Sequence, residues 1–129
     1  MKKLLIIPML FACYMVMGQD AAKIIGTPYQ LNNIEVAQHD FPNAQNWKDA
    51  IAKCNKLGEG WRLPTKNELN KLYKNKKKIG GFKDSYLDDF YWSSAEKENL
   101  VAPGQDFFNG NQGTANKYLK KYVRAVRTK

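Results

Sequence analysis

The chain has 129 residues, a formal net charge of +9 and only two cysteines, Cys13 and Cys54. These residues are expected to form one domain of ordinary size and not two. Two cysteines exclude a small scaffold that depends on several disulfides. The positive charge would favour a nucleic-acid ligand in a cytoplasmic protein, so its meaning depends on the cellular location of the chain.

The first eighteen residues have the pattern of a bacterial signal sequence. Lys2 and Lys3 precede an uncharged apolar run at residues 4–17, which is too short to span a bilayer comfortably. Val16 and Gly18 are small enough for the −3 and −1 positions of signal peptidase, which predicts cleavage before Gln19. We therefore expect a signal peptide at residues 1–18 and a single domain at residues 19–129, with its core at about 29–127.

Two alternatives remain open for this segment. It could be a buried N-terminal helix or a membrane anchor, although Pro8 and Gly18 interrupt the run. It could also be the leader of a lipoprotein, because Cys13 follows the small residue Ala12 and would carry the lipid. The expected location is secreted, periplasmic or at the cell surface, with a lipoprotein as the alternative. No transmembrane span is expected after removal of the signal.

Export changes how the charge is interpreted. The mature net charge is +7, since Lys2 and Lys3 leave with the signal. An exported basic protein is expected to meet anionic polysaccharide, lipid head groups or an acidic protein, and not nucleic acid. The lysines of residues 71–78 are first of all a solvated helix face. Cys54, the only cysteine left, is expected to be a small buried residue.

The first half of the mature chain predicts a strand and a helix. Residues 20–28 are expected to be a mobile lead-in, residues 29–38 a strand with a bulge, and residues 40–43 a loop. Residues 46–57 carry an apolar stripe at helical spacing, with Asn46 as the N-cap and Gly58 as the stop signal.

A second helix is predicted after residue 64. Thr65 and Glu68 form the T-x-x-E pattern of a capping box, and Pro64 holds the preceding residue extended. Residues 80–81, both glycine, end this segment. Trp61 and Leu63 are expected to fill the core between the two helices.

The last third changes from helices to strands. Strands are predicted at residues 90–94, 100–108 and 122–127, and a polar glycine-rich turn at residues 109–113 follows the second of them. Helices followed by hairpins predict an α+β domain, with two helices packed on a small antiparallel sheet.

Three separated motifs give the chain a family resemblance. In order and spacing it resembles the bacterial Lcl C-terminal-like domain family, a family of unknown function, over residues 34–127. The resemblance implies a C-type-lectin-like fold, export, and display for binding or adhesion. The motifs contain Trp61, Arg62, Leu63, Pro64, Thr65 and Glu68, then Trp92 with its neighbours at residues 91–94, and finally residues 122–127. We expect packing and capping roles for these residues.

The R-L-P-T element is distantly similar to the scaffold of formylglycine-generating enzymes. That resemblance implies copper chemistry at C-terminal cysteines, and this chain has no cysteine after Cys54. The E-P-N and W-N-D motifs of calcium-dependent lectins are also missing. His39 is the only histidine and is expected to be a loop residue. We therefore expect no enzyme, no metal site and no cofactor, and keep a formylglycine-generating-type enzyme as a remote alternative.

The remaining candidate surface is the polar region between residues 92 and 118. Amide groups and an aromatic ring suit a sugar, and nearby lysines favour an acidic one. The candidate ligand-binding residues are Asn109, Asn111, Gln112, Asn116, Tyr118 and Lys120. The sequence thus predicts a non-catalytic binding module for an anionic glycan. The alternative is a structural or docking domain for a protein of the cell envelope.

Overall fold

The computed structural model describes residues 20–129. The predicted signal peptide and the alternative lipid-anchor residue Cys13 lie outside the described residues. The protein contains helices α2 (Trp47–Lys56), α3 (Lys66–Lys74) and α4 (Lys76–Ile79). Its strands are β1 (Tyr29–Leu31), β2 (Ile34–Val36), β3 (Phe90–Trp92), β4 (Val101–Asp106), β5 (Gln112–Asn116) and β6 (Val126–Thr128). The predicted α+β class is confirmed.

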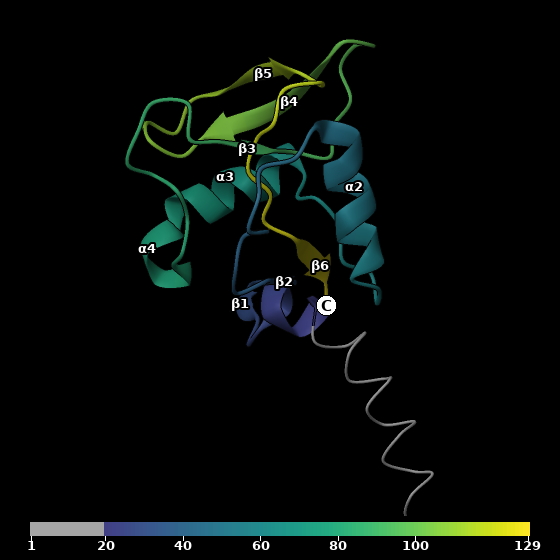
Figure 1. Ribbon diagram of the computed structural model, residues 1–129. Helices are drawn as coiled ribbons and strands as arrows, with labels where there is room; N and C mark the ends of the chain where they lie inside the picture. Colours follow the sequence, from purple (N-terminus) through teal and green to yellow (C-terminus); the bar gives the residue numbers. More distant parts are fainter. Residues whose placement is uncertain (1–19) are drawn as a thin grey trace, which may run out of the picture.

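The strands form two antiparallel sheets where the sequence predicts one. One sheet has the order β1-β2-β6 and the other β3-β4-β5. The two sheets lie at opposite ends of the molecule, with α2 along one side and α3 and α4 along the other (Figure 1). Residues 121–127 connect the two sheets, because Tyr122 pairs with Tyr91 of β3 and Val126 pairs with Val36 of β2.

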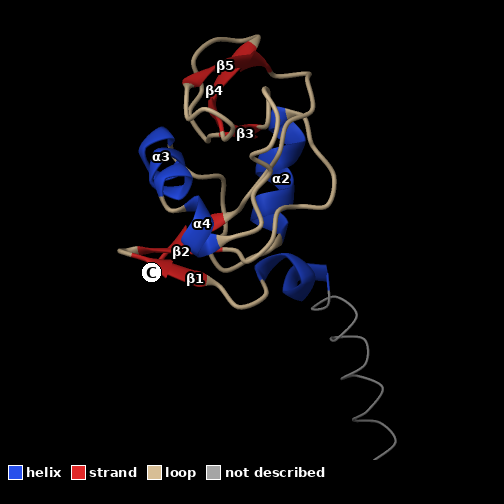
Figure 2. Ribbon diagram, turned by 90° about the vertical axis from the view of Figure 1, so that its left-hand side faces the viewer, coloured by secondary structure: helices blue, strands red, loops and turns tan. Residues whose placement is uncertain are grey.

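Figure 2 shows the two sheets, in red, at the two ends of the domain. The core of the domain consists of two hydrophobic clusters. The first lies against α2 and contains Trp47, Cys54 and Trp92, and the second lies against α3 and contains Leu69 and Leu72. The predicted apolar stripe of the first helix is thus confirmed as its buried face.

The predicted helix caps are confirmed. The Asn46 side chain accepts a hydrogen bond from the Asp49 backbone N–H (2.9 Å). The Thr65 hydroxyl accepts from the Glu68 N–H, and the Glu68 carboxylate accepts from the Thr65 N–H, which completes the capping box. These caps fix where both helices begin and in which direction the chain enters them.

Two predicted segments differ from the structure. The single strand at residues 29–38 is a hairpin, because Asn32 adopts a left-handed conformation (φ 53°) and turns the chain. The lead-in at residues 20–28 is helical over residues 20–25, where Ile24 is buried. Its Ile24 and Ile25 carbonyls accept hydrogen bonds from His39 and Gln38.

The β3-β4 pairing requires the glycine at position 104. Gly104 lies opposite Trp92, and a Cβ atom there would lie 2.2 Å from the Tyr91 carbonyl oxygen. The close approach lets β4 sit centrally between β3 and β5. No helix within residues 20–129 has the length and apolarity needed to cross a membrane.

Candidate functional site

The family motif forms a network of ion pairs and caps inside the fold. The Arg62 guanidinium donates to both carboxylate oxygens of Glu68 (2.7 and 3.0 Å) and to the Thr128 hydroxyl. The hydrogen bonds from Arg62 hold the pKa of Glu68 below its usual value. The Arg62 backbone pairs with Val126 in both directions, which ties the start of α3 to β6.

The rest of the motif packs. Trp61, Leu63, Pro64 and Trp92 are buried. The Pro64 carbonyl accepts a hydrogen bond from the Ser94 N–H (2.7 Å). The Trp92 indole N–H donates to the Gln45 carbonyl oxygen. These contacts are the packing and capping roles that the sequence predicts.

Arg124 is the most deeply buried charged residue of the last motif. Its side chain is fully buried, its Nε donates to Asp40 (2.7 Å), and its other nitrogens donate to the carbonyls of Ala37 and Gly80. Its guanidinium carbon lies 4.0 Å from the centre of the Phe82 ring. The Tyr91 hydroxyl also donates to Asp40. Arg62, Glu68, Thr65, Arg124 and Asp40 are called the motif network below.

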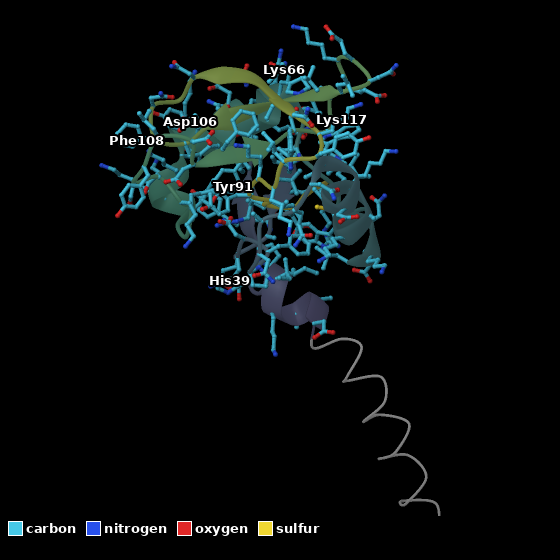
Figure 3. The ribbon with its side chains drawn as sticks, turned by 45° about the horizontal axis from the view of Figure 1, so that its top comes forward. His39, Lys66, Tyr91, Asp106, Phe108 and Lys117 are labelled. Atoms are coloured by element: carbon cyan, nitrogen blue, oxygen red, sulfur yellow. The ribbon has the colours of Figure 1, made fainter. Side chains whose placement is uncertain are left out.

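The structure separates the six predicted ligand residues into two groups. Asn109, Asn111 and Gln112 lie at one end of the β4-β5 hairpin, and Asn116, Tyr118 and Lys120 follow the other end. Strand β5 puts about 14 Å between them. Figure 3 shows the same separation, with Phe108 and Lys117 on opposite sides of the molecule. The six residues therefore do not form one site.

The first group of amides is engaged in the scaffold. The Asn109 side chain accepts from the Asn111 backbone N–H (2.9 Å). The Gln112 amide donates to the Lys66 carbonyl and to the Gln105 side chain. These contacts attach the hairpin to the beginning of α3, which leaves the Gln112 amide nitrogen without a free proton for a ligand.

In the second group, Tyr118 lines a cleft of about 200 Å³, whereas Asn116 and Lys120 are not part of its lining. We call it the Tyr118 cleft. It is lined by Asn46, Lys48, Asp49, Asn99, Lys117 and Tyr118. Five of these six residues were not among the predicted ligand residues; only Tyr118 was. Asn46, Lys48 and Asp49 come from the N-cap and first turn of α2, Asn99 comes from the loop before β4, and Lys117 directly precedes Tyr118. Nothing in the sequence indicates that these segments meet.

Lys117 holds the cleft together. Its carbonyl accepts from the Trp47 N–H at the start of α2, and its N–H donates to the Leu100 carbonyl. Its buried ammonium donates to Glu96 (2.6 Å) and lies 4.7 Å from the centre of the Trp47 ring. The hydrogen bond from Lys117 lowers the pKa of Glu96. Tyr118 is thereby fixed beside the first turn of α2.

Three side chains of the Tyr118 cleft are available to a ligand. Within residues 20–129, the side chains of Lys48, Asn99 and Tyr118 make no hydrogen bond or ion pair to another residue. The Tyr118 side chain is 80% exposed. By contrast, Asn46 and Asp49 bond to each other, and Asn116 accepts from the Tyr118 N–H. The cleft offers a ring, an amide and an ammonium group.

The carboxylates of Glu96 and Asp106 lie near different ends of β4. Asp106 accepts from the N–H groups of Asp88 and Phe108, at the end of β4 remote from Glu96. Cys54 is buried, and burial raises the pKa of its thiol to about 12. Among the described residues, no three histidine, cysteine or acidic side chains are placed to share a metal ion. His39 is exposed in a loop (Figure 3).

Comparison with known proteins agrees with this architecture. The model of the Lcl C-terminal domain family matches residues 21–127. Among solved structures, the chain is similar to botrocetin, with 10% identity, a TM-score of 0.58, and coverage of 81% of this chain and 98% of that chain. A chain from a complex of botrocetin with a mutant von Willebrand factor A1 domain matches with 12% identity, a TM-score of 0.56 and the same coverage. No curated protein matches by sequence. The fold is thus C-type-lectin-like.

Proposed function

Because the chain belongs to the Lcl C-terminal domain family and has a C-type-lectin-like fold, we propose that it is an exported, non-catalytic binding module of the bacterial envelope or exterior. We propose further that it recognises an anionic glycan at the Tyr118 cleft. The observation that carries this proposal is the exposed Tyr118 ring beside the side chains of Lys48 and Asn99, which have no hydrogen-bond or ion-pair partner among residues 20–129.

The chemistry of the cleft suits an acidic sugar. An aromatic ring presents a flat apolar surface with a polar tip, which matches the apolar face of a sugar ring. The Asn99 amide can both donate to and accept from hydroxyl groups. The Lys48 ammonium can form a charge-assisted hydrogen bond with a carboxylate or a sulfate. All three groups are exposed, so we expect weak binding that high salt reduces.

A binding role without catalysis accounts for the remaining groups. The one thiol of the described residues, that of Cys54, is buried in the first hydrophobic cluster and stays protonated at neutral pH. Of the acidic residues near the cleft, Asp49 accepts a hydrogen bond from the Asn46 side-chain amide at the start of α2, and Glu96 forms an ion pair with Lys117. The formylglycine-generating-type alternative therefore receives no support from the placement of Cys54.

A glycan array tests this proposal. The purified protein should bind sulfated or uronic-acid glycans, and the signal should fall as salt rises. Tyr118→Ala and Lys48→Ala should each weaken binding about tenfold. The matched controls are Tyr86→Ala, a tyrosine that is 76% exposed on another loop, and Lys78→Ala on α4. Equal binding by all four variants would remove the Tyr118 cleft from consideration.

A second function, docking to an envelope protein, is favoured by a separate groove at the other end of α2. The groove has a volume of about 670 Å³ and an apolar floor. The botrocetin structure in complex with a von Willebrand factor A1 domain is a structure of this fold with a protein partner. A stoichiometric envelope partner together with a blank glycan array would favour this second function over the first.

A further inference from the structure

The groove of about 670 Å³ lies between the helical segment of residues 20–25 and the last turn of α2. In Figures 1 and 2 this N-terminal helical segment lies below the lower end of α2. The ten residues of α2 put about 15 Å between this end and the Tyr118 cleft. The groove is therefore separate from the Tyr118 cleft, and it can hold a different ligand.

The floor of the groove is apolar and rigid. Ile24 is buried in the first hydrophobic cluster, and Phe41 and Leu57 pack partly buried against that cluster. Backbone hydrogen bonds from His39 to Ile24 and from Phe41 to Val123 hold the wall segments in place. A preformed apolar depression of this volume is of the size that takes a few side chains of a ligand.

Three lysines stand on the two sides of this floor. Lys23 lies on the N-terminal helical segment, and Lys53 and Lys56 lie three residues apart on one face of α2. None of the three forms an ion pair within residues 20–129, and residues 1–19 contain no aspartate or glutamate to pair with them. Asp20 is the single acidic side chain in the lining.

We propose that this groove docks a short acidic amphipathic helix from a protein partner. The apolar side of that helix covers Ile24, Phe41 and Leu57, and carboxylates on its two flanks pair with Lys23 on one wall and with Lys53 and Lys56 on the other. Charge complementarity selects this occupant, since the lysines flank the apolar floor on both sides.

The size of the groove limits the strength of the contact. The six-residue wall at 20–25 is about 9 Å long, which accommodates roughly two turns of a docked helix. Such an interface is well below the area of a standard stable complex. We expect micromolar or weaker affinity with a strong dependence on salt.

The test uses two synthetic helical peptides with the same leucine stripe, one flanked by glutamates and the other by lysines. Fluorescence anisotropy of the labelled peptides measures their binding to the purified protein. The glutamate peptide should bind at least about tenfold more tightly than the lysine peptide. The K53E/K56E variant should reverse this order, losing about tenfold for the glutamate peptide and gaining affinity for the lysine peptide.

The matched control is K77E/K78E, which makes the same change in net charge on the exposed lysines of α4. It should change both affinities by less than about twofold. Equal losses in K53E/K56E and K77E/K78E would overturn the proposal, because the binding would then follow overall charge. Melting temperatures close to that of the parent protein should show that both variants are folded.

Two further results would also overturn the docking proposal. One is no binding of the glutamate peptide at about 1 mM. The other is K53E/K56E-sensitive binding to anionic phosphatidylglycerol vesicles with no binding of the peptide, which would assign the groove to a lipid surface. Glycan binding measured on K53E/K56E should be unchanged, so failure here is distinguishable from failure of the Tyr118 cleft.

Discussion

The motif network and the Tyr118 cleft use similar polar side chains in opposite ways. In the motif network, Arg124 donates to Asp40 and to backbone carbonyls, and Arg62 donates to both oxygens of Glu68. In the Tyr118 cleft, the side chains of Lys48, Asn99 and Tyr118 have no such partners within residues 20–129. The first region satisfies its own polar groups, and the second leaves them to a ligand.

The residues that identify the family are therefore different from the residues that we expect to bind the ligand. The motif residues position helices and sheets, so they can identify the fold without touching what it binds. The ligand groups come from the beginning of α2, the loop before β4 and the segment after β5. Substitutions in the two regions should therefore act on different quantities: the free energy of unfolding in the motif network, and affinity in the Tyr118 cleft.

The largest effect on stability should come from Arg124. Arg124→Met leaves the buried Asp40 carboxyl without its cationic partner and removes donors from the Ala37 and Gly80 carbonyls. We expect a loss of about 3–5 kcal/mol in the free energy of unfolding, measured by urea denaturation.

The control for this prediction is Arg127→Met. Arg127 belongs to the same motif, but its guanidinium is partly exposed and pairs with Glu35 and with Glu59 at the surface. It should lose only about 1 kcal/mol. Equal losses for the two arginines would show that burial of the Arg124 pair does not set the stability of the motif network.

A smaller effect, with a distinctive pH dependence, should come from Glu68. Its pKa is lowered in the folded protein, chiefly by hydrogen bonds from Arg62, so its ionised form stabilises the fold above its unfolded-state pKa of 4.5. That contribution is lost as the pH falls through the lower folded-state pKa. Glu68→Gln should cost about 1–2 kcal/mol at neutral pH and progressively less below pH 4.5.

Urea denaturation at neutral and acidic pH, with Glu59→Gln as the comparison, measures this effect. The Glu59 side chain is 85% exposed, so that variant should stay within about 0.5 kcal/mol of the parent protein. A Glu68→Gln penalty that is the same at both pH values would contradict the role given to the Arg62–Glu68 pair.

The smallest effect on stability should come from Tyr118. With its side chain 80% exposed, Tyr118→Ala should change the free energy of unfolding by less than about 0.5 kcal/mol. A loss of 2 kcal/mol or more in the same denaturation assay would place Tyr118 with the scaffold and erase the contrast between the two regions.

The sequence was sufficient for the local signals of this fold. Asn46 and Thr65 act through residues three positions away, so the caps of α2 and α3 can be predicted from short patterns. The buried stripe of α2 has helical spacing and is equally local. The same local patterns did not predict the turn at Asn32. A weak alternation of apolar and polar residues continues across it, and Asn tolerates the left-handed conformation.

The candidate site depends on contacts that are distant in the sequence. Strand β5 is almost wholly exposed and polar, so no alternating pattern marks it; it forms by pairing with β4, and that pairing carries Gln112 and Asn116 to opposite ends. Lys48 and Asn99 meet Tyr118 only because Lys117 joins α2 to β4. Local patterns predict neither result.

The central claim is that the Tyr118 cleft, and not the family motif, contacts the ligand. The most direct measurement is the affinity of the purified Tyr118→Ala and Tyr86→Ala variants for the anionic oligosaccharide that binds best on the array, by titration calorimetry. These two tyrosines have similar exposure at different places in the fold. We predict about tenfold weaker binding for Tyr118→Ala and no change for Tyr86→Ala. Equal affinities for both variants and the parent protein would contradict the claim.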